Sequence, residues 1–288
     1  MANTAARDLP TPVPSPNRKV VTPASRRRGS FRWPVLNLHD DVDLTYTYVP
    51  LLLYCVVSGI CDSVAFNAAG VFVSMQTGNT IFLSLGASHL PAGQPRLWLK
   101  AIVSIACFQA GCFLFAHFHR LGGRIQRKIL LFVSALVQAL FVVAAAALAQ
   151  ARVAPAFGDS RLSPTDTDPL RAEQADAAIV LLPVALLAFQ FGGQVYTSRV
   201  LGFSEVPTSV LTSLYCDLFS DPLLFGPLRT NAKRNRRLAA IVLTVCGGIA
   251  AGWLQRSRAG MSGALWIAAG IKLIVSMLWL AWPRKSKP

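Results

Sequence analysis

The sequence predicts an all-α polytopic membrane protein with about six transmembrane helices and two short broken or re-entrant helices. Of its 288 residues, 53% are hydrophobic, and the mean hydropathy is +0.47. Charged residues make up only 14%, well below the roughly 25% of soluble domains. Six apolar runs have about the 17–25 residues that a helix needs to cross a bilayer. These runs are residues 49–69, 99–118, 129–149, 177–198, 238–254 and 263–282.

The chain divides into a transmembrane domain and two basic tails. Residues 1–45 are rich in Pro, Ser, Thr and Arg and contain almost no apolar run, so we expect a disordered N-terminal tail. The transmembrane domain is expected over residues 46–283, with halves 46–149 and 177–283 joined by the linker 150–176. Residues 284–288 form a short basic C-terminal tail.

Composition also limits the partners. The formal net charge is +15, but the basic residues lie in the tails and in short loops. No separate basic domain exists, so we expect the lipid bilayer as a partner and no nucleic acid. The six cysteines lie in apolar segments without metal-ligand spacing, so we expect no metal and no cofactor. A homo-oligomer stays open.

Two apolar pieces, residues 71–85 and 206–219, are too short to cross. As helices they would be about 21–22 Å long at 1.5 Å per residue, against a hydrocarbon core of about 30 Å. Each follows a full span almost directly, so the chain must break. We place the first break near Gly70. The second is placed between Gly202 and Pro207, where Ser204 suits an N-cap and Pro207 a first helical turn.

Loop charges predict the topology. Residues 119–128, residues 221–237 and both tails are basic, whereas the linker is mainly acidic. With six spans and neither short piece crossing, every basic segment falls inside and the linker outside, as the positive-inside rule requires. If one or both short pieces cross, at least one basic loop lies outside. We therefore expect six spans, two re-entrant pieces, and cytoplasmic N- and C-termini.

The two halves have the same order of elements: span, short piece, span, span. Each half has an odd number of spans, so the second half starts on the opposite side of the membrane from the first. This order predicts an inverted repeat. In transporters, discontinuous helices in corresponding positions of such repeats bracket the substrate site near the midplane.

The first break carries a family resemblance. Gly59 and Asp62, followed by Met75-Gln76-Thr77-Gly78-Asn79, resemble the signature of the YoaK family of uncharacterised membrane proteins (domain of unknown function 1275). In the second half, Gly193-Gln194 followed by residues 206–212 is similar to a second motif of that family. Val195 and Ser213 depart from that motif, which usually has Asn and Gly there. The resemblance covers about residues 45–283 and implies an integral membrane protein without a settled activity.

Polar residues inside apolar segments are the candidate site. Asp62 and Lys272 lie within predicted spans, where charged side chains are costly and usually face a cavity or a partner. They either pair with each other, or Lys272 binds an anion and Asp62 serves another role. The alternative for the uncharged residues is helix packing. The candidate solute-binding residues are Asp62, Gln76, Thr77, Gly78, Asn79, Gln194, Thr208, Thr212 and Lys272.

These observations favour a secondary transporter or facilitator for a small polar or ionic solute. The alternative is a membrane scaffold or lipid-binding regulator that uses its broken helices for packing. No catalytic motif is present, and a lone Asp62 cannot supply both an acid and a base, so we expect no enzyme activity.

Overall fold

The computed structural model describes residues 38–90, 96–123, 126–158 and 177–285. The predicted disordered tail therefore lies almost wholly outside the described residues, as do most of the acidic linker and the last three residues. Residues Pro34–Pro288 form one compact unit, to which the following description is confined.

Six long apolar helices confirm the predicted fold class and the number of spans in the described part of the chain. Two short helices, α2 and α7, lie at the positions of the two short apolar pieces. All regular structure in these residues is helical apart from two isolated β-bridges. The long helices are α1 (Tyr48–Ala69), α3 (Leu97–Leu121), α4 (Lys128–Gln150), α6 (Leu181–Val200), α8 (Ala232–Arg256) and α9 (Gly260–Ala281); the short helices are α2 (Gln76–Gly86) and α7 (Leu211–Phe219).

Both short helices begin later than the sequence predicts. Residues 70–75 and 201–210 are not α-helical, so each break is a segment rather than a single residue. Gly70 and Gly202, with φ of +73° and +77°, turn the chain at the end of α1 and α6, a conformation that favours glycine. The prediction that Ser204 caps the second short helix was wrong, because α7 starts at Leu211 with Val210 as its N-cap.

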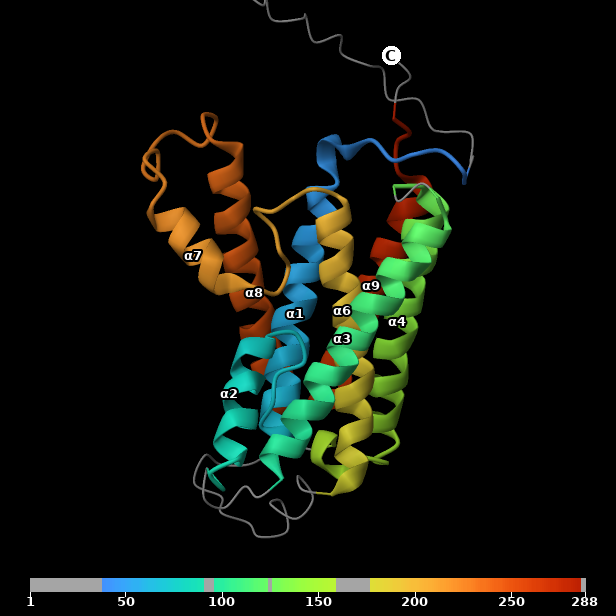
Figure 1. Cartoon of the computed structure of the whole chain (residues 1–288), viewed down its shortest axis with the longest axis vertical. Helices are drawn as coiled ribbons and strands as arrows, with labels where there is room; N and C mark the ends of the chain where they lie inside the picture. The colour runs from blue at the N-terminus through green and yellow to red at the C-terminus, as the bar shows by residue number, and fades with distance from the viewer. Residues whose placement is uncertain (1–37, 91–95, 124–125, 159–176, 286–288) are drawn as a thin grey trace, which may run out of the picture. The chain divides into compact units, whose positions relative to one another are not determined.

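The long helices pack as three pairs: α1 on α8, α3 on α6, and α4 on α9. In addition, α4 contacts α6 and α9 contacts α1, so the three pairs form one bundle. The short helix α2 packs against α3, and α7 packs against α8. Figure 1 shows α2 and α7 on the same flank of the bundle, one toward each end. Neither short helix crosses the bundle.

Glycines bring α1 and α8 into backbone contact. A Cβ placed on Gly59 would lie 2.1 Å from the carbonyl oxygen of Thr244, and one on Gly247 would lie 2.4 Å from that of Val56. No real Cβ tolerates such distances. Small residues that let backbones approach closely are typical of helix interfaces in membranes.

The pair α3 and α6 is built in the same way. A Cβ on Gly192 would lie 2.3 Å from the carbonyl oxygen of Phe108, and one on Gly111 would lie 2.0 Å from that of Phe189. In both pairs, therefore, one glycine of each helix faces a backbone carbonyl of the other.

Residues 38–46 are held by the rest of the unit rather than continuing the predicted disordered tail. The Val42 amide donates to the Gln126 carbonyl (3.0 Å), and the Asp43 amide donates to the Pro283 carbonyl (2.9 Å). Composition suggested disorder because these residues lack an apolar run; backbone hydrogen bonds to neighbouring loops supply the order instead. These bonds put the start of α1, the α3–α4 connection and the end of α9 on one side of the bundle, as an even number of spans requires.

Candidate functional site

Asp62 holds the first break against α1. Its carboxylate accepts hydrogen bonds from the backbone amides of Val73 and Ser74 (both 2.8 Å) and from the Ser74 hydroxyl (2.5 Å). Asp62 lies about two turns before the end of α1 and is only 6% exposed. The break therefore folds back along α1 into the bundle, and α2 starts from inside it. Unpaired backbone groups at that depth need such partners.

Asn79 holds the other side of the same break. Its side chain accepts from the Phe72 amide (3.0 Å) and donates to the Phe72 carbonyl (2.6 Å). It also donates to Gln76 (2.8 Å) and to Ser104 of α3 (3.1 Å), while the Gln76 amide donates to the Val73 carbonyl (3.0 Å). The structure thus brings together three predicted site residues, Asp62, Gln76 and Asn79. Their polar atoms form hydrogen bonds with the backbone of the break.

Thr77 and Gly78, which lie between Gln76 and Asn79 in the sequence, have other surroundings. Thr77 is exposed. Gly78 lies against the ring of Phe72, which a Cβ would meet at 2.8 Å. Its hydrogen side chain therefore lets α2 approach the returning segment.

The second break is held across the two halves of the chain. The Ser58 hydroxyl of α1 donates to the Thr208 carbonyl (2.7 Å), and the Gln194 side chain of α6 donates to the Ser58 hydroxyl (2.9 Å) and the Tyr54 carbonyl (3.3 Å). Thr208 has φ of +62° and is 3% exposed, so this segment also returns into the bundle. Thr212 is exposed and does not join this cluster.

Lys272 of α9 lies in the core of the bundle and is 0% exposed. Its ammonium nitrogen donates to Oε1 of Gln138 on α4 at 2.9 Å. It also lies 4.5 Å from the centre of the Tyr54 ring and 5.7 Å from that of Phe191. The alternative in which Asp62 pairs with Lys272 is not what the structure has, because the two side chains have different partners.

Several buried polar atoms near these residues have no hydrogen-bond partner. Both side-chain polar atoms of Gln190 are in this state, although the residue is 0% exposed, and so are Oε1 of Gln194 and Oγ1 of Thr208. Each such group costs about 1–3 kcal/mol. Buried polar atoms of this kind are rare in folded proteins and call for a partner such as water, an ion or a ligand. The Gln138 and Gln190 side chains were missed in the sequence, although a glutamine inside an apolar span is itself a signal.

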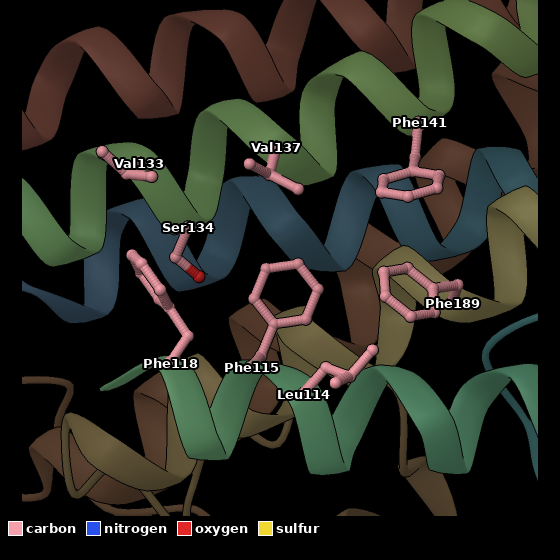
Figure 2. A pocket seen from close by; sticks show the side chains of 8 residues that line it. All are labelled: Leu114, Phe115, Phe118, Val133, Ser134, Val137, Phe141 and Phe189. Atoms are coloured by element: carbon pink, nitrogen blue, oxygen red, sulfur yellow. The ribbon is translucent and has the colours of Figure 1, made fainter. Parts of the chain in front are cut away.

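A separate apolar groove opens between α3 and α4 (Figure 2). Its volume is about 240 Å³. Figure 2 shows side chains of α3 and α4 facing each other across it, with Phe189 of α6 at one end. The lining residues are Leu114, Phe115, Phe118, Val133, Ser134, Val137, Phe141 and Phe189. All but Ser134 are apolar, so the groove is separate from the buried polar residues described above.

Comparison with known proteins identifies a family but no activity. Residues 50–278 match the family described as "Protein of unknown function (DUF1275)". No curated protein and no solved structure matches the chain. The matched region begins in α1 and ends in α9, so it includes both breaks, four long helices in full and most of α1 and α9. The chain therefore belongs to the DUF1275 family, and its six apolar helices make it a multi-pass integral membrane protein.

Proposed function

We propose that this protein is a secondary transporter or facilitator for a small polar or ionic solute. The observation that carries the proposal is the pair of breaks, which return into one bundle from opposite ends and leave unpaired polar side chains between them. In our proposal, the two halves form an inverted repeat, and the solute site lies in the core between the breaks.

The order and length of the helices support the repeat. The helices α1, α2, α3 and α4 have 22, 11, 25 and 23 residues. Their proposed counterparts α6, α7, α8 and α9 have 20, 9, 25 and 22 residues. If the two halves correspond in this way, the contact between α1 and α8 should have a counterpart between α6 and α3. The contact between α4 and α9 is then its own counterpart. All three contacts are present.

The glycine contacts support the same correspondence at the level of single residues. Gly59 of α1 faces a carbonyl of α8, and Gly192 at the same level of α6 faces a carbonyl of α3. The return contacts, from Gly247 of α8 and Gly111 of α3, are equally close. Chance resemblance of two apolar segments would not reproduce reciprocal backbone contacts at the middle of both pairs.

The two breaks differ in a way that suits a moving element. Asp62 and Asn79 hold the first break with a dense set of bonds from its own half. In contrast, the second break is tied to the other half chiefly through Ser58. Movement of the second break away from α1, with the three helix pairs kept together, would therefore break few hydrogen bonds to the other half. Alternating access in such folds is largely movement of one part against the other.

Flux through reconstituted vesicles tests the proposal. Purified protein in liposomes is challenged with osmotic gradients of neutral solutes and of potassium salts with valinomycin, and volume change is followed by stopped-flow light scattering. The expected result is faster flux of at least one solute than in protein-free vesicles and in vesicles with the Gly192→Leu variant, whose side chain would separate α6 from α3. Equal rates for all solutes in all three preparations would remove the proposal.

The proposal includes no catalytic role. Asp62 is the intramembrane carboxylate singled out from the sequence, and both of its oxygens accept hydrogen bonds from the first break. It is therefore a positioning residue in this account, as is Asn79.

The groove of Figure 2 favours a second candidate, a lipid-binding scaffold or regulator. A cavity of about 240 Å³ exceeds the roughly 150 Å³ apolar cavity that stays dry and takes a benzene molecule. One lipid acyl chain is the occupant that matches its size and its apolar lining.

Lipid retention separates the two candidates. Native mass spectrometry of detergent-purified protein is expected to show a retained lipid that Val137→Trp, which fills the groove, removes. Leu140→Trp is the matched control, because Leu140 is on the same helix, is 53% exposed and does not line the groove. Equal retention of the lipid in both variants would dismiss the lipid site. Loss of the lipid in Val137→Trp, together with no solute flux in any of the vesicle preparations, would favour the second candidate.

A further inference from the structure

We propose that the solute is a small anion and that Lys272 is the residue that binds it. The inference rests on the proposed function, since it names the class of solute for the core site between the breaks. It follows from a count of the buried charges, from the unused hydrogen-bonding capacity of Lys272, and from the side chains around it.

The buried charges leave Lys272 without a counterion. Among the described residues, the buried carboxylates are those of Asp62 and Glu205, each 6% exposed. Asp62 accepts bonds from Val73 and Ser74, and Glu205 pairs with Arg236 at 2.8 Å. Neither contacts Lys272. An ammonium group inside a membrane is costly and normally has a charged or polar partner, so the structure favours a negatively charged ligand over a neutral or cationic one.

The Lys272 ammonium has hydrogen-bonding capacity that the protein does not use. It has three donor hydrogens, and Gln138 takes one. The faces of the Tyr54 and Phe191 rings lie beside it, which favours a cation at this place without supplying a conventional acceptor. Two N–H groups therefore remain for a ligand.

The amide that contacts Lys272 is held by its own helix. The Gln138 amide nitrogen donates to the Ser134 hydroxyl at 3.3 Å, which directs Oε1 of Gln138 toward Lys272. Gln138 is uncharged, so it accepts from Lys272 without neutralising the ammonium. An ammonium with two further N–H donors and no carboxylate partner in the described part of the chain offers what an anion needs and what a metal cation would avoid.

The site is closed to both sides in this structure. Lys272, Gln190 and Gln194 are each 0% exposed. The structure thus corresponds to an occluded form, and an anion would enter when the second break moves away from Ser58 of α1.

Anion flux in proteoliposomes tests the inference. The probes are chloride, nitrate, acetate and phosphate as potassium salts with valinomycin, beside glycerol and urea as neutral solutes. The variants are Lys272→Met, which keeps the length of the side chain without its charge, and Lys272→Arg, which keeps the charge. Lys233→Met is the matched control, because Lys233 is exposed at the start of α8. Lys272→Gln replaces Lys272→Met if the latter fails to elute as a single species.

The expected result is flux of at least one anion that falls tenfold or more in Lys272→Met, is partly retained in Lys272→Arg and is unchanged in Lys233→Met. That anion should also raise the melting temperature of the wild type and not of Lys272→Met, since a ligand stabilises the state that binds it. Flux of neutral solutes alone would overturn the anion inference and keep transport. Anion flux or thermal stabilisation that is unchanged in Lys272→Met would overturn the role of Lys272. No flux and no stabilisation with any probe would overturn both proposals.

Discussion

Alanine at Gly59 or Gly192 should destabilise the protein to a similar extent. The new Cβ would lie 2.1 or 2.3 Å from a carbonyl oxygen of the facing helix, whereas ordinary van der Waals contact begins near 3.4 Å. The two backbones must therefore separate by about 1 Å, a gap that removes a quarter to a half of each dispersion contact along the interface. Overpacking of this kind lowers the free energy of unfolding by about 3 kcal/mol, whereas the better helix propensity of alanine raises it by about 1 kcal/mol.

The net loss of about 2 kcal/mol corresponds to a fall in melting temperature of about 4–8 °C. Thermal unfolding in one detergent, followed by circular dichroism, measures it. Gly252→Ala is the matched control, because Gly252 lies on α8 with no heavy atom within 4 Å of the added Cβ. It should melt at the wild-type temperature or slightly above. If Gly59→Ala and Gly192→Ala melt like Gly252→Ala, the backbone contacts described for both pairs are wrong.

Two further substitutions probe the polar anchors. Asp62→Ala leaves two amides and a hydroxyl of the first break without their acceptor, and should lower the free energy of unfolding by about 3 kcal/mol or more. Asp62→Asn keeps an oxygen for the amides and should lower it by about 1 kcal/mol in the same unfolding assay. Equal losses in the two variants would contradict the role given to the carboxylate. Arg234 is 3% exposed and donates to four carbonyls of the α7–α8 connection, from Leu223 to Pro227. Arg234→Met should therefore make that connection sensitive to limited proteolysis, and unchanged cleavage would show that the arginine does not order it.

Much of the fold can be predicted from composition alone. The apolar runs indicate six spans because a bilayer requires about twenty apolar residues for each crossing. The short pieces stand out for the same reason, and the loop charges favour a topology in which neither piece crosses. These arguments use only length, hydropathy and charge, which are local properties of the sequence.

The geometry of the breaks could not be predicted in this way. Residues 71–75 are as apolar as a helix, yet they are not helical, because Asp62 and Asn79 bind their backbone. The second break depends on Ser58, which is distant in sequence and has no local signal. For this reason both short helices were expected to start too early, and Asp62 was considered as a partner of Lys272.

The structure brings some of the candidate residues together and separates others. Asp62, Gln76 and Asn79 do lie together, whereas Thr77 and Thr212 are exposed. Motif membership does not tell which side of a helix a residue faces. Gln138 binds Lys272, and Gln190 is a buried glutamine of α6 without a hydrogen-bond partner among the described residues. These side chains lie on spans outside the motifs, so a search limited to the motifs could not find them.

Accessibility of the core from both sides of the membrane tests the transport mechanism most directly. After replacement of the six native cysteines, single cysteines at Ser58 and Gln194, both almost fully buried, are exposed to an impermeant thiol reagent on one side of oriented vesicles at a time. Ala264→Cys, at a fully buried apolar position of α9, is the control. The account predicts modification of Ser58→Cys and Gln194→Cys from either side and none of Ala264→Cys. Protection of both core cysteines from both sides, in a preparation that keeps its fold, would contradict it.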